Sequence, residues 1–196
     1  MLDEPLSALD AKVRVSLRDE IRAIQKRLGI TTIFVTHDQE EALSISDRVI
    51  VMYQGVAEQV AVPFEIYNRP ATKFVANFVG TLNVLEGVVS DAAKGTVKVG
   101  DGHVSVQGKL GNHKNGDAVT LAMRPEAIAL GDYPGCDQKL NGKIADVHFL
   151  GSVIRVKVAV GKDTVSMDTF NKSTTPPPVV GQPAEITFAS NDVLVL

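Results

Sequence analysis

The sequence predicts an α/β segment followed by an all-β domain, with the change close to residue 80. Before this point, apolar residues recur every three or four positions or form short continuous runs. After it the apolar residues alternate, as at Val104 and Val106, and turn residues interrupt the chain about every eight to twelve positions. We therefore expect two domains, residues 1–79 and residues 80–196.

The first long element expected is a helix over residues 11–28. Its apolar residues are spaced three or four positions apart, with charged and polar residues between them: Val13, Leu17, Ile21, Ile24 and Leu28. This spacing is typical of an amphipathic helix. Gly29 follows at the position where a left-handed residue commonly ends a helix.

A strand, a second helix and a further strand are expected after Gly29. The β-branched run at 30–36 predicts a buried strand. Asp38 and Glu41 have the spacing of a helix N-cap and its reciprocal partner, so a helix is expected from residue 39. The apolar run at 48–52 predicts the next strand. This alternation favours a parallel sheet that is covered on both faces.

Two short helices, at 63–68 and 71–79, are expected to complete the first domain, separated by Pro70, which cannot continue a helix. The second domain is expected to consist of short strands near 83–90, 96–99, 103–107, 118–124, 142–149, 152–160, 163–169, 184–189 and 193–196. So many short strands favour a small closed barrel or sandwich, related to the oligonucleotide/oligosaccharide-binding (OB) type.

The composition narrows the range of functions. With 196 residues and 44% apolar content, the chain is long enough to form real cores. A net charge of −3 and the absence of tryptophan argue against a nucleic-acid partner. The single cysteine, Cys136, excludes an internal disulfide, and no apolar run is long enough to span a bilayer. A cytoplasmic location is expected, with any membrane association made through a partner protein.

Two carboxylates and an imidazole follow the ends of predicted strands. Asp3 and Glu4 come where a strand ends, and His37 follows the strand at 30–36. A right-handed crossover between parallel strands would bring these three side chains to one edge of the sheet. Such a set suits phosphoryl transfer to water, which needs a metal ligand, a group that orients the water and a donor to the phosphate. Taken without this context, a bare Asp-Glu pair would be better explained as a solvated strand end.

Several stretches in order resemble the ATP-hydrolysing subunits of ABC transporters. Two carry the resemblance in the first domain: Leu-Asp-Glu-Pro-Leu-Ser-Ala-Leu-Asp at 2–10 and Val-Thr-His-Asp-Gln-Glu-Glu-Ala-Leu at 35–43. Later stretches are similar to importers of the sugar, polyamine, iron and phosphonate group, whose subunits carry a C-terminal regulatory barrel called TOBE: residues 65–70, 74–80, 123–126 and 149–151.

The resemblance implies a role for five residues. Asp3 matches the Walker B aspartate that positions Mg²⁺, and Glu4 matches the carboxylate that polarises the attacking water. His37 matches the switch histidine that reaches the γ-phosphate. Ser7 and Asp10 match the D-loop, which in the family crosses a dimer interface to the second subunit. The family's cofactors, ATP and Mg²⁺, are expected of the full-length protein and not of this chain alone.

The sequence lacks three elements of that family. It has no Gly-x-x-x-x-Gly-Lys-Ser/Thr loop, no glutamine loop and no Ser-Gly-Gly-Gln signature. The expectation is therefore a truncated energy-coupling ATPase subunit of an ABC importer, which drives solute uptake when the missing N-terminal half is present. The alternative is a regulatory, ligand-sensing or protein-docking β-barrel beside a vestigial ATPase segment.

The resemblance also implies the partners. They are a second copy of the ATPase subunit, membrane-spanning permease subunits and, indirectly, a substrate-binding protein. Neither nucleic acid nor direct insertion into the membrane is expected. The location implied is peripheral, at the inner face of the cell membrane, through the permease subunits.

We predict that the isolated chain neither hydrolyses ATP nor binds it well. The backbone N–H groups that would surround the β- and γ-phosphates are not encoded in it. Phosphate release from Mg-ATP by the purified chain should equal the buffer blank. Measurable turnover would contradict the expectation of a truncated ATPase.

Overall fold

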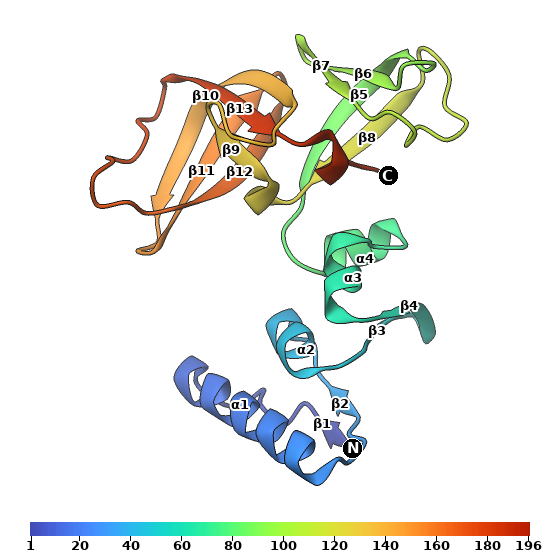
Figure 1. Cartoon of the computed structure of the whole chain (residues 1–196), viewed down its shortest axis with the longest axis vertical. Helices are drawn as coiled ribbons and strands as arrows, with labels where there is room; N and C mark the ends of the chain where they lie inside the picture. The colour runs from blue at the N-terminus through green and yellow to red at the C-terminus, as the bar shows by residue number, and fades with distance from the viewer. The chain divides into compact units, whose positions relative to one another are not determined.

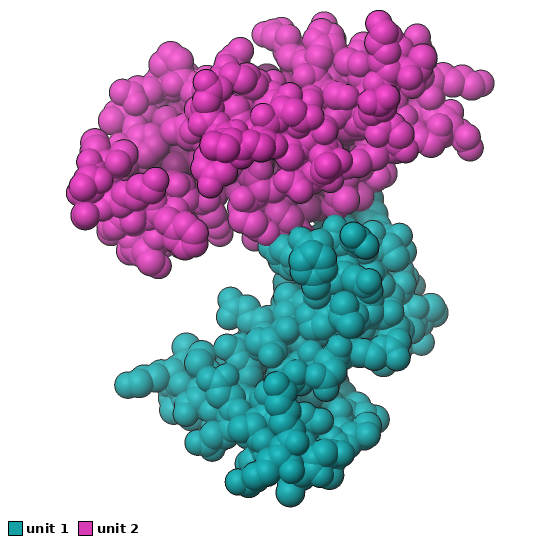
Figure 2. Space-filling view, in the orientation of Figure 1, with its two compact units in different colours: residues 1–80 teal, residues 81–196 magenta.

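The computed structural model describes all 196 residues, which divide into two units, residues 1–80 and residues 81–196 (Figures 1 and 2). All four α-helices belong to the first unit, whereas the second contains strands and two short 3-10 turns. Each unit has its own apolar core. None of the helices combines the length and the apolar composition that a bilayer span requires.

The first unit begins with a parallel pair of short strands joined by a long helix. Strand β1 (Leu2–Asp3) pairs with β2 (Phe34–Val35), and helix α1 (Ala11–Leu28) connects them. The Asp10 carboxylate accepts hydrogen bonds from two backbone N–H groups in the first turn of α1. Gly29 ends the helix with a φ of 63°. The predicted helix and its glycine stop are thus confirmed.

The rest of the first unit is a short helix, a hairpin and two further helices. In chain order these are α2 (Gln39–Ile45), β3 (Val49–Tyr53), β4 (Val56–Ala61), α3 (Pro63–Asn68) and α4 (Lys73–Phe78). Strands β3 and β4 are antiparallel. Their inner face packs on α3 and α4 around a small core of Val51, Ile66, Val75 and Val79.

Two predictions for the first unit are wrong. The parallel sheet covered on both faces is not formed, because β3 pairs with β4 and not with β2. The strand expected to be buried at 30–36 is reduced to two paired residues, and Ile33 and Val35 are 61% and 42% exposed. The sheet formed by β1 and β2 has no further strands beside it, so the β-branched residues of this segment remain exposed to solvent.

Helix α1 shows the same lack of cover. The predicted apolar stripe is present, but no residue of the helix is buried. Val13, Ile24 and Leu28 are exposed. The first unit therefore presents uncovered apolar surface along α1 and β2, while its small core lies beneath the β3–β4 hairpin.

The second unit contains two five-stranded sheets. The first has the order β14-β8-β5-β6-β7, made by Leu194–Val195, Ala118–Met123, Asn83–Asp91, Thr96–Val99 and Gly102–Ser105. The second has the order β12-β11-β10-β13-β9, made by Asp163–Phe170, Val153–Val160, Gln138–Phe149, Pro183–Phe188 and Ile128–Leu130. All the predicted strands are present.

Two details of the strand prediction differ from the structure. Strand β9 was not expected, since three residues that follow the turn Pro125–Ala127 are too few to show alternation. Strand β10 begins at Gln138, four residues earlier than expected, and Gly142 lies within it. A Cβ on Gly142 would lie 2.3 Å from the carbonyl oxygen of Ala159, so this glycine allows close strand approach and marks no turn.

The second sheet curls into a nearly closed barrel, because its two edge strands, β9 and β12, contact each other. The expected barrel is therefore present, with the other five-stranded sheet packed against it through β5 and β7. One continuous core joins the two sheets, with Leu85 and Leu121 from one side and Val156 and Phe188 from the other. The second unit is an all-β domain with a single core.

Polar side chains join parts of the second unit that the strand ladders do not connect. The buried Asn83 amide donates to the Ser166 carbonyl and accepts from the Ser166 N–H, both at 2.7 Å, as a paired strand would. The Lys109 ammonium donates to the carbonyls of Ser190, Asn191 and Val193 at 2.8–2.9 Å. Burial lowers the pKa of Lys109 from its ordinary value. These contacts fix β12 against β5 and hold the C-terminal segment in place.

We predict that the second unit folds by itself, whereas the first requires a partner surface. The barrel and its packed sheet bury a continuous core, whereas helix α1 buries no residue. Ordering the backbone costs roughly 1–2 kcal/mol of conformational entropy per residue, and α1 has no apolar burial to offset this cost. Hydrogen exchange on the whole chain at low concentration should show strong protection only beyond residue 80. Equally strong protection of Phe34 and Val35 in a proven monomer would contradict this.

Candidate functional site

The pairing of β1 with β2 places two predicted site residues together. Because the strands are parallel, their carboxyl ends lie at one edge. The Glu4 N–H donates to the Val35 carbonyl at 2.9 Å, which extends the ladder by one residue. His37 comes two residues after β2. Its Nδ1 lies 3.1 Å from Oε1 of Glu4.

The contact between Glu4 and His37 is open to solvent. The two side chains are 48% and 73% exposed. Water screens an exposed pair of this kind, so the contact contributes little to folding stability. A carboxylate and an imidazole on adjacent strand ends are instead accessible to a ligand. This arrangement suits a carboxylate that orients water and an imidazole that donates to an oxyanion.

The backbone at Glu4 is strained. Its φ is 43°, in the left-handed region that residues other than glycine rarely adopt. Ser7 holds this turn, since both its hydroxyl and its N–H donate to the Glu4 carbonyl, at 3.0 and 3.3 Å. Strain of this kind persists only when neighbouring contacts impose it, and it concentrates at functional sites.

Asp3 and Asp10 lie on either side of this turn. Asp3 is exposed on β1, in register with Val35. Asp10 is exposed as well, and its Oδ1 caps helix α1. No group of three His, Cys, Asp or Glu side chains converges in a way that could hold a metal ion. Of the five predicted site residues, the structure brings only the Glu4 and His37 side chains into contact, with Ser7 holding the turn beside them.

The segment around His37 is held differently from the prediction. Asp38 caps α2 as expected, accepting from the N–H groups of Glu40 and Glu41 at 2.9 and 3.2 Å. Glu41 does not complete a reciprocal box, so that part of the prediction is wrong. The Thr36 hydroxyl takes its place by accepting from the Asp38 N–H at 3.0 Å, and it donates to Glu41 at 2.6 Å. A threonine two residues before the cap satisfies the backbone donor that Glu41 was expected to satisfy.

Arg14 is a further site residue that the sequence reasoning missed. From the first turn of α1 its guanidinium donates to Asp38 Oδ2 at 3.2 Å and to the Leu9 carbonyl at 3.0 Å. Its Nε lies 3.7 Å from Glu41, which is 3% exposed. The available signal was its position four residues after the Asp10 cap, which places it at the end of the helix nearest the site. Spacing alone could not identify Asp38 and Glu41 as its partners, because both lie more than twenty residues away in the sequence.

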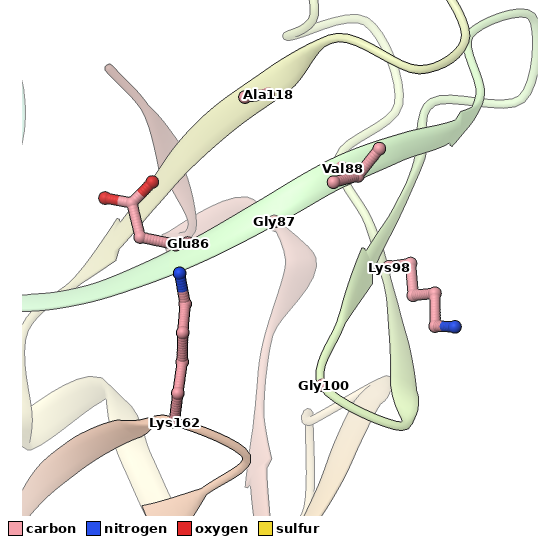
Figure 3. Close-up of a pocket in the computed structure, with 7 residues that line it drawn as sticks. All are labelled: Glu86, Gly87, Val88, Lys98, Gly100, Ala118 and Lys162. Carbon is pink, nitrogen blue, oxygen red and sulfur yellow. The ribbon is translucent and has the colours of Figure 1, made fainter.

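A separate pocket lies on the second unit. It has a volume of about 390 Å³ and is lined by Glu86, Gly87, Val88, Lys98, Gly100, Ala118 and Lys162. Figure 3 shows the Lys162 ammonium directed towards β5, whereas Lys98 points away from it. The Glu86 carboxylate accepts from the Thr120 hydroxyl at 3.4 Å. The charged groups do not converge on one point, so the pocket has no evident ligand.

Comparison with known proteins shows which proteins the chain is similar to. The TOBE domain family matches residues 121–196. The Fe(3+) ions import ATP-binding protein FbpC 2 of Rhizobium meliloti is 42% identical over 170 residues, covering 81% of this chain and 42% of that protein. The spermidine/putrescine import ATP-binding protein PotA of Ureaplasma parvum is 42% identical over 173 residues, covering 88% of this chain and 32% of that protein. The chain is homologous to the C-terminal region of ABC importer ATP-binding subunits.

The chain thus spans less than half of the length of these two importer subunits. Their names give different cargoes, an iron ion in one and polyamines in the other. Among solved structures, the cytoplasmic molybdate-binding protein ModG matches with a TM-score of 0.43 and 15% identity, covering 58% of this chain and 94% of that chain. The resemblance to importer ATP-binding subunits with a TOBE domain is confirmed.

Proposed function

We propose that this chain forms the C-terminal part of an importer ATPase subunit, in which Glu4 and His37 act on the γ-phosphate of ATP. The observation that carries the proposal is the 3.1 Å separation of Glu4 Oε1 from His37 Nδ1 at the ends of two parallel strands. The strained backbone at Glu4 and the homology to importer ATP-binding subunits support it. The rest of the phosphate site is supplied by the N-terminal part of the full-length subunit.

Each side chain has a distinct chemical task in this proposal. The Glu4 carboxylate accepts a hydrogen bond from the attacking water and orients it towards phosphorus. The His37 imidazole donates to a γ-phosphate oxygen, where negative charge is concentrated. In the imidazolium form both ring nitrogens carry a hydrogen, so Nδ1 donates to Glu4 while Nε2 donates to the nucleotide. Both groups are exposed, so a nucleotide can reach them without unfolding any element.

The residues present also fit a magnesium ion that arrives with ATP. Mg²⁺ in phosphate sites is held by one or two carboxylates together with phosphate oxygens and water, so a cage of protein ligands is not required. Asp3 offers such a carboxylate at the edge that carries Glu4. When bound, the ion would neutralise charge on the β- and γ-phosphates.

The proposal includes the partners of the complete subunit. Ser7 and Asp10 face a second copy of the subunit across a dimer interface, and permease subunits hold the dimer at the inner face of the membrane. A substrate-binding protein supplies the cargo indirectly. Exposure of the Ser7 and Asp10 side chains, together with the uncovered apolar surface of α1, supports an assembly with further protein surfaces.

We predict that Glu4→Gln in a full-length subunit carrying this segment keeps ATP binding and loses turnover by about 10²–10⁴-fold. The amide cannot polarise water as the carboxylate does, while Asp3 remains available to the metal. Nucleotide binding and steady-state phosphate release would both be measured. Glu40→Gln, an exposed glutamate in the first turn of α2, is the matched control and should retain turnover. Normal turnover in Glu4→Gln would exclude Glu4 as the water-orienting carboxylate.

We predict that His37→Ala in the same protein lowers kcat by about 10²–10³-fold with little change in Tm. An exposed imidazole contributes little to packing, so its loss should affect phosphate contact and not folding. His148→Ala is the matched control, because His148 contacts Asp146 at 2.8 Å and is also exposed. A large fall in Tm with unchanged specific activity of the folded fraction would show that His37 is structural.

A further inference from the structure

We propose that Arg14 is a positioning residue that couples the turn before helix α1 to the His37 segment. The inference rests on the proposed function of His37, and it adds a residue that controls where the imidazole lies. Its basis is one guanidinium that contacts both segments at once. It donates to the Leu9 carbonyl on one side and to Asp38 on the other, where its Nε also forms an ion pair with Glu41 at 3.7 Å. The polar contacts of Arg14 are with neither Glu4 nor His37, so it acts through other groups.

The first side of the contact is the turn that contains Ser7 and Asp10. Leu9 is the residue just before the Asp10 cap, and its carbonyl accepts from Arg14 Nη2 at 3.0 Å. The cap fixes the start of α1 through two backbone N–H groups. Arg14 lies one helical turn further along, so its backbone moves with that start. A displacement of the Leu9 turn therefore displaces the guanidinium.

The second side of the contact is the chain on either side of His37. Asp38, the next residue, accepts from Arg14 Nη1 at 3.2 Å. Thr36, the preceding residue, donates to Glu41, whose other carboxylate oxygen lies 3.7 Å from Arg14 Nε. The two neighbours of His37 are joined in turn, because the Asp38 N–H donates to the Thr36 hydroxyl. His37 is thus bracketed by two residues that depend on the same guanidinium.

Charge and burial make Arg14 necessary to this arrangement. The Glu41 carboxylate is 3% exposed, and its neighbours are the Thr36 hydroxyl and Arg14. A buried carboxylate is strongly disfavoured when its cationic neighbour is removed. A planar guanidinium can also donate to the Leu9 carbonyl and to Asp38 while its Nε faces Glu41, a geometry that the single ammonium of lysine cannot reproduce. The position of His37 therefore depends on an arginine at this site.

The same helix provides a matched control. Arg22, two helical turns after Arg14, donates to Asp47 at 2.7 Å and to the Ile45 carbonyl. It joins α1 to the far end of α2 and contacts none of the residues next to His37. Substitutions of Arg22 remove a comparable tie between the helices. They should leave the His37 segment unchanged.

The test uses a full-length subunit that carries this segment, with Arg14→Met and Arg14→Lys compared with the same two changes at Arg22. We expect Arg14→Met to lower kcat by about 10²-fold, with Arg14→Lys intermediate and KM for ATP little changed. Arg22→Met and Arg22→Lys should retain turnover. If Arg14→Met does not fold, Arg14→Lys carries the comparison.

A double-mutant cycle with His37→Ala separates positioning from general damage to the fold. If Arg14 acts through His37, Arg14→Lys should cause no further loss of turnover once the imidazole is absent. Equal losses with and without His37 would overturn the proposal. Normal turnover in a folded Arg14→Met variant would overturn it as well.

A second readout does not depend on hydrolysis. In ¹⁵N-histidine-labelled full-length protein, the His37 signal is assigned by its loss in His37→Ala. We expect that signal to shift in Arg14→Lys and to stay unchanged in Arg22→Lys. An unshifted signal in Arg14→Lys would refute the positioning role. Absence of ATP turnover in the unsubstituted protein, by contrast, would refute the proposed function and leave this measurement to decide on Arg14.

Discussion

The parallel pairing of β1 with β2 is the constraint on which the candidate site depends. Only two residues of each strand are in register, yet their pairing places Glu4 beside His37 although 33 positions separate them in the sequence. Helix α1 forms the crossover, so its cap and the Arg14 side chain become part of the same edge. The strained φ of Glu4 and the Ser7 bonds that hold it are local consequences of ending β1 at this point. The site is therefore defined by chain topology, with side-chain bonds fixing its details.

The two units achieve order by different physical means. The second unit buries a continuous core between two sheets. Polar side chains join strands that backbone ladders do not connect, as where Asn83 hydrogen-bonds to the backbone of Ser166. The first unit has only a small core under the β3–β4 hairpin, and α1 is tied to α2 by charged groups, Arg14 at one end and Arg22 at the other. Ion pairs and backbone caps fix geometry well but contribute less stability than buried apolar area. The residues proposed for chemistry thus lie in the unit with the weaker core.

Local patterns in the sequence were sufficient to predict an element wherever the spacing of apolar residues repeats along that element. The apolar spacing of residues 11–28 with Gly29 defined α1, and alternation located the strands of the second unit other than β9 to within a few residues. The burial of residues 30–36 could not be predicted, because burial depends on which strands lie alongside and not on β-branched composition. Glu41 was wrongly predicted to accept a hydrogen bond from the Asp38 N–H for a related reason. The Thr36 hydroxyl is a second acceptor for this N–H, and it is the one that accepts in the folded turn. The convergence of Glu4 and His37 followed from crossover handedness, whereas the partners of Arg14 required three-dimensional coordinates.

The uncovered apolar residues on α1 and β2 also affect how the protein behaves in solution. The net charge is only −3, so repulsion between molecules is weak at neutral pH and vanishes near the isoelectric point of about 5.8. At that pH net charge repulsion no longer opposes contact between exposed apolar side chains such as Ile33 and Leu28. Sulfate and phosphate salts, which are excluded from protein surfaces, strengthen the same contacts. Association through these apolar residues of the first unit is therefore expected to increase with mild acidity and with these salts, even while the barrel stays folded.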